Sequence, residues 1–177
     1  PIAAQKARYL INEKRYDEAI RILKSDRSSP YDTRPEYFLA MAYFEKKMPD
    51  SAMYYSHKVY EMKPLHFKNI SILTNTMLQQ GKEKEAEEIL DGYLASNKPD
   101  KEAAIFASSL YDRTGSVQKA VQVIDTAAVL FPADTTIIKQ KNYIHRRKVL
   151  SENKETVDAA MEAFRAKRYI EAVVYLN

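Results

Sequence analysis

The feature that most constrains the fold of this chain is an alanine that returns at a nearly constant interval. It stands in similar phrases, from YDEAI near the beginning to YIEAV near the end. The five alanines are Ala19, Ala52, Ala86, Ala120 and Ala172. They are 33, 34, 34 and 52 residues apart, so three steps are one period and the fourth exceeds it by 18 residues. A period of this length predicts an array of small repeated units.

A second small residue stands twelve positions before each alanine, and it indicates what each unit is. These residues are Ala7, Ala40, Thr74, Ser108 and Ala160. Two small residues at this spacing suit two antiparallel helices of about 14 residues whose backbones approach closely. Larger residues follow on the same helical faces, three positions after the first small residue and four after the alanine. They are Leu10, Tyr43, Met77, Tyr111 and Ala163, and Leu23, Ser56, Leu90, Ile124 and Leu176, of which Ala163 and Ser56 fit least well.

Helix-breaking residues fall where such units require them. Pro30, Pro64, Pro99 and Pro132 are predicted to end successive units, because proline stops a helix. Gly81 and Gly115 fall between the two helices of their units and are expected to accept a positive φ. Residues 33–36 have the spacing of a capping box, from Thr33 to Glu36. With only three glycines in the chain, an array of strands and turns is disfavoured.

These units resemble the tetratricopeptide repeat, a helix–turn–helix unit of 34 residues. Lys6 and Pro49 depart from its pattern. The 35-residue RNA-reading repeats and the 36-residue Sel1-like repeats fit the steps of 33 and 34 less well. The resemblance implies an all-α fold, a right-handed superhelical solenoid of antiparallel helix pairs.

The period also predicts how the chain is divided. Four repeats are expected at about residues 1–32, 33–66, 67–100 and 101–133. The additional half period predicts one basic capping or linking helix over 134–150, with Asp134 as a candidate N-cap. A fifth repeat over 153–177 would stop within its second helix, which favours the hypothesis that the sequence is part of a longer protein.

In the family resembled here, the first helices of the repeats line a concave groove that receives a peptide. The resemblance therefore implies a non-catalytic scaffold for protein–protein interaction. The expected groove residues are Arg8, Tyr37, Met41, Phe44, Lys68, Ser71, Asn75, Gln79, Ile105, Ser109, Asp112 and Arg113.

Some of these residues have an alternative role in packing between repeats, namely Tyr37, Phe44 and Ile105. The amides and hydroxyls of Asn75, Gln79 and Ser109 suit a peptide backbone better. Some members of the family clamp a C-terminal carboxylate with basic residues and asparagine. Of the corresponding positions here, only Lys68 keeps that chemistry, which excludes this type of binding; the five positions are Ala4, Arg8, Phe38, Lys68 and Ile72.

Nothing in the sequence indicates catalysis, a metal or a cofactor. His57, His66 and His145 are far apart, whereas a metal site needs three or four converging ligands. The glutamates of residues 83–88 begin a helix, where the helix dipole favours negative charge. No phosphate-binding loop or nucleophile motif is present, and there is no cysteine. The chain is therefore expected not to be an enzyme.

The net charge of +4 comes from one element. Lys139, Lys141, Arg146, Arg147 and Lys148 form a basic patch in residues 135–150, which contain no acid, and the rest of the chain sums to −1. A local patch disfavours nucleic acid as a partner and favours a protein or peptide, although an acidic partner of the patch stays open. Packing is the predicted role of the tyrosines near repeat positions, which are Tyr9, Tyr16, Tyr43, Tyr54, Tyr111 and Tyr169.

The apolar residues of the segment 135–150 form three pairs around its axis. The pairs are Ile137 with Ile144, Ile138 with Val149, and Tyr143 with Leu150. No single apolar face results, so we expect a helix with neighbours on several sides rather than one lying on a membrane.

No apolar run approaches the roughly 20 residues of a membrane-spanning helix. The absence of cysteine fits cytoplasm and periplasm equally, so the compartment and the oligomeric state stay open. The rival hypothesis is a soluble regulatory or assembly tail of a larger membrane or envelope enzyme, such as a glycan ligase or polymerase.

Overall fold

The computed structural model describes residues 2–25, 31–96 and 100–176, and for residues 171, 172 and 176 it describes the backbone alone. The described residues form helices, turns and loops, without strands. The chain separates into two compact units, residues 1–98 and 99–177.

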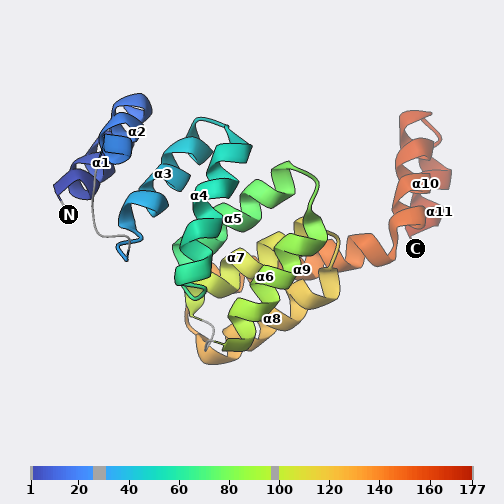
Figure 1. Cartoon of the computed structure of the whole chain (residues 1–177). Coiled ribbons are helices and arrows are strands. Elements are labelled where there is room, and N and C mark those ends of the chain that lie inside the picture. Colours follow the sequence, from blue (N-terminus) through green and yellow to red (C-terminus); the bar gives the residue numbers. More distant parts are fainter. Residues whose placement is uncertain (1, 26–30, 97–99, 177) are drawn as a thin grey trace. The chain divides into compact units, whose positions relative to one another are not determined.

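Unit 1 contains three helix pairs, each closed by a turn of three residues (Figure 1). Their helices are α1 (Ile2–Asn12) and α2 (Tyr16–Ser25), α3 (Arg34–Glu45) and α4 (Pro49–Met62), and α5 (Phe67–Gln79) and α6 (Glu83–Ser96). The first helix of a pair packs on both helices of the preceding pair, so that α3 contacts α1 and α2, and α5 contacts α3 and α4. Stacking of this kind buries the apolar faces that a single pair leaves exposed.

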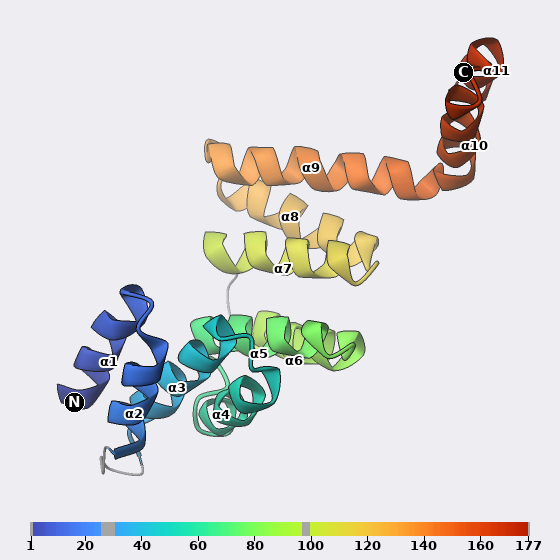
Figure 2. The same cartoon turned by 90° about the horizontal axis from the view of Figure 1, so that it is seen from above.

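Unit 2 begins with one further pair, α7 (Lys101–Arg113) and α8 (Val117–Leu130). A long helix, α9 (Thr135–Glu152), packs on both of them, and a last pair, α10 (Lys154–Arg165) and α11 (Tyr169–Leu176), follows after the single residue Asn153 (Figure 2). Asp134 caps α9 as the sequence predicts, because its side chain accepts hydrogen bonds from the backbone N–H groups of Thr136 and Ile137. Each unit is thus built from helices that are consecutive in the chain.

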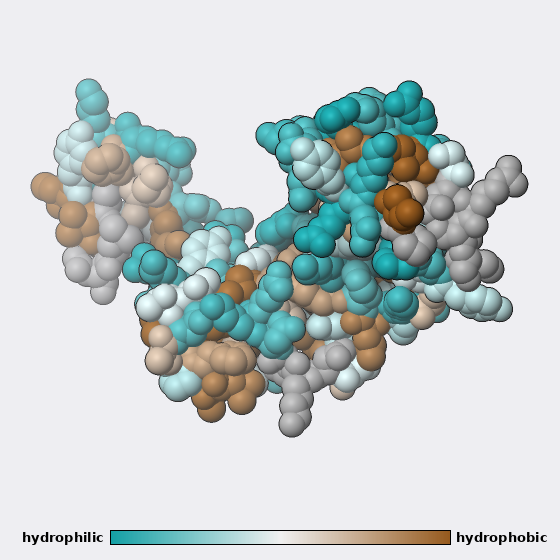
Figure 3. All heavy atoms as spheres, turned by 90° about the vertical axis from the view of Figure 1, so that its left-hand side faces the viewer, coloured by the Kyte–Doolittle hydropathy of each residue, from teal (hydrophilic) through white to brown (hydrophobic). Residues whose placement is uncertain are grey.

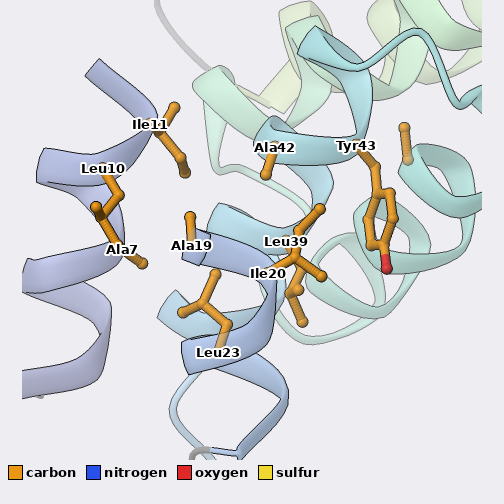
Figure 4. Close-up of a cluster of buried hydrophobic side chains, with 10 residues drawn as sticks. Ala7, Leu10, Ile11, Ala19, Ile20, Leu23, Leu39, Ala42 and Tyr43 are labelled. Carbon is orange, nitrogen blue, oxygen red and sulfur yellow. The ribbon is translucent and has the colours of Figure 1, made fainter. Parts of the chain in front are cut away.

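The repeated residues lie in the core, as predicted. Ala19, Ala52, Ala86 and Ala120 have no exposed surface, while the side chain of Ala172 lies outside the described residues. The small residues of the first helices are buried as well, and these are Ala7, Ala40, Thr74, Ser108 and Ala160. Figure 4 shows how they work in unit 1: Ala7 and Leu10 on α1 face Ala19 and Leu23 on α2, and Leu39, Ala42 and Tyr43 on α3 complete the same cluster. Short side chains let the helices approach, and the larger ones fill the space between them.

The turn between the two helices of a pair always contains one residue in the left-handed region. Gly81 and Gly115 have φ of 71° and 84°, as predicted. The same position is held by Lys14, Lys47 and Lys167, with φ between 56° and 60°. The repeat therefore extends to the backbone conformation of its turn.

One expectation about local structure needs correction, the capping box at residues 33–36. Thr33 is buried and makes no capping hydrogen bond through its side chain. Its backbone is already helical, and Asp32 instead accepts the backbone N–H of Arg34 at 3.1 Å. Ser56 is fully buried at a position that leucine or isoleucine fills elsewhere, and no partner of its hydroxyl is described. Pro64 and Pro132 lie between helices as predicted, whereas Pro30 and Pro99 lie outside the described residues.

The tyrosines divide between core and surface. Tyr43 and Tyr111 are buried, and Tyr16 packs against the core of unit 1. The prediction of packing is wrong for three others, because they are more than half exposed; these are Tyr9, Tyr54 and Tyr169. They stand beside repeat positions and not in them, on the outer side of their helices.

The helix α9 has neighbours in α7, α8 and α10, but they cover only part of its apolar surface. Its buried residues are Ile137 and Ile144, which form one of the three apolar pairs. The other two pairs are exposed, Ile138 with Val149 and Tyr143 with Leu150.

Candidate functional site

The first helices of unit 1 lie side by side, because α3 contacts both α1 and α5. Eight of the twelve expected groove residues are on these three helices. Arg8, Lys68 and Gln79 are exposed, and the other five are half-buried; these are Tyr37, Met41, Phe44, Ser71 and Asn75. We call this set the first-helix face. Met41 and Phe44 also pack against the core, so packing between repeats accounts for part of their surface.

Tyr37 lies at the meeting point of the three helices. Its ring packs edge-on against His66, with ring centroids 4.9 Å apart, and lies 5.3 Å from the ring of Phe38. Burial raises the pKa of Tyr37, and the positive charge of Arg8 on α1 opposes that change. The hydroxyl of Tyr37 therefore remains protonated at neutral pH and is able to donate a hydrogen bond.

His66 adjoins this face through Tyr37, although sequence reasoning considered it only as a possible metal ligand. It is the N-cap of α5, and its Nδ1 atom accepts the backbone N–H of Asn69 at 3.1 Å. Burial and the neighbouring Lys63 lower the pKa of His66, so the ring is neutral at pH 7. Its place immediately before a predicted helix was the signal that could have identified it as a cap.

The polar residues of α5 are ordered by their own helix. Ser71 donates to the backbone oxygen of Lys68 at 2.9 Å, and Asn75 donates through Nδ2 to the backbone oxygen of Ser71 at 2.8 Å. Side chains held in this way lose little further entropy when a ligand arrives. The exposed ends of the row are Lys68 and Gln79.

The four expected groove residues of unit 2 are in a different situation, because α9 lies against α7. Gln140 donates to the hydroxyl oxygens of Ser109 at 2.9 Å and of Ser108 at 3.2 Å. Asp112 is buried and accepts hydrogen bonds from Tyr143 at 3.2 Å and from Arg147 at 3.1 Å. Ser109 and Asp112 are therefore engaged by α9, while Ile105 is half-buried and Arg113 is exposed.

The expected basic patch is largely neutralised within unit 2. Lys141 pairs with Asp125 at 3.0 Å, Arg147 with Asp112 at 3.1 Å, and Lys148 with Glu152 at 3.8 Å. Burial tends to raise the pKa of Asp125, but the hydrogen bonds from His145 and Lys141 outweigh it, and the pKa is lowered. No ion pair is described for Lys139 or Arg146. A continuous basic track of the kind that follows a nucleic-acid backbone is thus not formed by the described part of α9.

The histidines do not converge on a metal site. His57 is on α4, His66 caps α5, and His145 accompanies Asp125 at 2.9 Å. Among the described residues, no group of three or more histidine, aspartate or glutamate side chains is placed to hold a metal ion. No described helix joins the length of a bilayer span to the apolar composition that a span requires.

Comparison with known proteins identifies the fold. No family model and no curated protein matches the sequence. Solved structures of MamA, a tetratricopeptide-repeat protein, match it along 99% of its length. One crystal structure has a TM-score of 0.66 at 18% identity, with 86% of that chain covered, and MamA from residue 41 to the end from Desulfovibrio magneticus RS-1 has 0.61 at 18%, with 89% covered. A MamA AMB-1 structure has 0.62 at 16%, with 94% covered.

The fold is that of a tetratricopeptide-repeat protein. The all-helical architecture of antiparallel pairs expected from the 34-residue period is confirmed. At these identities the likeness concerns the fold.

Proposed function

We propose that unit 1 is a non-catalytic scaffold that binds a segment of a partner protein along the first-helix face. The observation that carries the proposal is the composition of this face. Half-buried aromatic side chains, ordered amide and hydroxyl groups and the exposed cations Arg8 and Lys68 lie on three adjacent helices. Apolar anchors surrounded by polar groups are typical of surfaces that bind peptides. In unit 2 the corresponding residues of α7 are engaged by α9, so the proposal is limited to unit 1.

The face suits a peptide better than a polyanion. Its cations are few, whereas Tyr37, Asn75 and Gln79 offer donors and acceptors that match a peptide backbone. Side chains such as Phe44 and Met41 would provide contacts for an apolar residue of the partner. The partner segment is therefore expected to carry at least one large apolar side chain between polar ones.

Site-specific photo-cross-linking tests this proposal. A photoreactive amino acid at Asn75 should capture the partner in cells that produce the full-length protein, whereas one at Glu61, exposed on α4, should not. The captured protein is then purified and its binding to the chain is measured. Replacing Tyr37, Asn75 and Gln79 together by alanine should weaken that binding at least about tenfold, a loss of about 1.4 kcal/mol, and should leave helicity unchanged.

The matched control replaces three residues on α4, which are Tyr54, Lys58 and Glu61. All three are exposed and none belongs to the first-helix face. Equal capture from Asn75 and Glu61, or full binding by the triple variant of the face, would refute the assignment.

A further inference from the structure

The helix α9 occupies the place of a first helix whose second helix is missing. It packs on α7 and α8 as α5 packs on α3 and α4. In the complete repeats, a small residue and a larger one three positions later face the second helix: Tyr43 stacks on Tyr55 of α4, and Met77 packs with Ala86 of α6. These pairs are Ala40 with Tyr43, Thr74 with Met77, and Ser108 with Tyr111, and all six residues are buried.

One period of 34 residues beyond Ser108 and Tyr111 lie Asn142 and His145 on α9. By the repeat, these two residues face the position of the absent second helix. They line a hollow of about 560 Å³ together with Arg146, Val149 and Leu150. We call these five residues the α9 slot. Val149 is 57% exposed and Leu150 47%, so the slot presents apolar surface that the other repeats cover with a helix.

The next helix of the same chain is poorly placed to fill the slot. The five helix pairs each reverse direction through a turn of three residues, whereas only Asn153 separates α9 from α10. Antiparallel helices need a connection of about two to five residues. Figure 2 shows α10 leading away from the end of α9, and in the described residues α10 packs chiefly against α11.

The hairpin of α10 and α11 has an uncovered apolar surface of its own. Met161 and Phe164 on α10 are 49% and 60% exposed, and Ile170 on α11 is 83% exposed. Figure 3 shows hydrophobic surface in brown on this distant, fainter part of the molecule. Within the part of the chain that the structure describes, these side chains of the hairpin and the α9 slot are both left exposed.

The two helices α9 and α10 have net charges of opposite sign. No ion pair is described for two cations of α9: Arg146 belongs to the slot, and Lys139 lies about one turn before Asn142. The helix α10 carries three acids for which no ion pair is described either, Glu155, Asp158 and Glu162, and two cations, Lys154 and Arg165, so its net charge is −1. Opposite charges around two apolar faces favour their association and set its orientation.

We propose that the α9 slot receives α10 of a second copy of the chain, so that two copies exchange their C-terminal hairpins. A short connection that prevents a helix from folding back on its own chain is the condition that favours such an exchange. With a longer turn, α10 could pack into the slot of its own chain. In the proposed dimer, the same contact between α9 and α10 is made between two chains. The proposal does not depend on the first-helix face.

The molar mass of the full chain, measured by light scattering between about 1 and about 100 µM, tests the proposal. The chain should dimerise. Val149→Asp, in the slot, should raise the dimer dissociation constant by about 100-fold, because a carboxylate would enter an apolar contact. Met161→Asp on α10 should do the same. The matched control is Val129→Asp on α8, whose side chain is 80% exposed and outside both surfaces, and this variant should remain dimeric.

Two further variants separate exchange from other association. Inserting Gly-Ser-Gly after Asn153 should produce a monomer, because α10 then has a turn long enough to return to its own α9. The chain has no cysteine, so a bismaleimide should join a tagged Val149→Cys copy to an untagged Val157→Cys copy when the two are mixed.

A chain that is monomeric at every concentration would overturn the proposal, and would leave the slot to a helix of another protein. A dimer that persists in Val149→Asp, or one that persists after the insertion, would also overturn it. Far-UV circular dichroism establishes that each variant is folded before its mass is interpreted.

Discussion

At the scale of single residues, the turn between the two helices of a pair requires one backbone conformation and obtains it from two kinds of side chain. Gly81 and Gly115 adopt positive φ without steric cost. Lys14, Lys47 and Lys167 adopt it at a cost of about 1 kcal/mol each, because the β-carbon approaches the following carbonyl oxygen. The glycines could be assigned to these turns from the sequence, whereas the lysines could not, because lysine seldom occupies the left-handed region.

Lys47→Gly is therefore expected to stabilise unit 1. The backbone hydrogen bond from Lys47 to the oxygen of Phe44 does not involve the side chain and is retained. Relief of strain should exceed the greater entropy of glycine in the unfolded chain and leave a gain of about 0.5 kcal/mol, measured as the shift of the urea midpoint. Lys47→Ala keeps the β-carbon and should give no gain. A loss of stability in Lys47→Gly would contradict this explanation.

Residue chemistry also explains a limit of the repeat pattern. The period correctly placed Ser56 in the core, but it could not predict which residues surround this side chain. Asn69 on α5 donates through Nδ2 to the backbone oxygen of Ser56 at 2.9 Å, so the fit at this position depends on another polar residue 13 positions away. A spacing rule reports which side of a helix is buried and not which hydrogen bonds form there.

At the scale of the element, α3 begins with an ion pair rather than with the expected capping box. Asp32 accepts the backbone N–H of Arg34 and three further bonds from its guanidinium, the shortest at 2.7 Å. The side-chain bonds from Arg34 dominate and lower the pKa of Asp32 to about 2. The sequence allowed either a capping box from Thr33 or an ion pair from Asp32 at the start of α3, because the two residues are adjacent. The backbone of Thr33 is helical, and its side chain makes no capping hydrogen bond.

Asp32→Asn should destabilise unit 1 at neutral pH and have a much smaller effect near pH 2. The carboxyl has a pKa of about 3.9 when unfolded, so its contribution is complete above about pH 5, declines as the pH falls toward 2 and disappears below that pH. Because Arg34 is half exposed, solvent screening limits the contribution to about 1 kcal/mol. Urea unfolding at pH 7 and near pH 2 measures it. Glu13→Gln, at an exposed acid, is the control, and an equal loss from Asp32→Asn at both pH values would be evidence against the ion pair.

The helix α9 is held to α7 by polar contacts along its length. Lys101 pairs with Asp134 at 2.6 Å, Gln140 bonds Ser109, and Arg147 bonds Asp112. The sequence predicted the helix and its cap but not this seam. Its partners are 31 to 35 residues apart, and nothing in the spacing of charges tells which side of α9 faces α7. Three of the five basic residues that suggested an external partner pair with acidic residues of unit 2.

Arg147→Met should destabilise unit 2 by about 1–2 kcal/mol. Asp112 is buried and would keep only Tyr143 as a partner, although exposure of Arg147 makes the cost smaller than for a fully buried pair. Adding Asp112→Asn should recover most of the loss, because the buried charge is then removed. Urea unfolding of both variants measures the effect, and Arg146→Met is the control at an exposed cation. If the double variant were as unstable as the sum of the single ones, the pair would not be coupled.

At the scale of the whole molecule, the repeat explains why the chain forms two compact units of unequal completeness. In a repeat array, stability comes from the contact of each helix pair with its neighbours, and about three pairs are needed. Unit 1 contains three complete pairs. Unit 2 contains the pair α7 and α8, the single helix α9, and a last pair whose apolar surface is exposed. The period alone predicted the pairs, but it could not predict which of them form a common core.

Residues 1–98 alone are therefore expected to fold, with a single cooperative thermal transition in far-UV circular dichroism. Their core contains clusters around Leu39 and around Leu73, both made of residues from unit 1 alone. Residues 99–177, measured separately at low concentration, should melt at a lower temperature because fewer of their apolar side chains are covered. A fragment of residues 1–66 is the control, since the loss of α5 and α6 leaves two pairs and should remove the cooperative transition. If residues 1–98 melted without a transition, or residues 99–177 proved the more stable, the number of stacked pairs would not be what determines the stability of each unit.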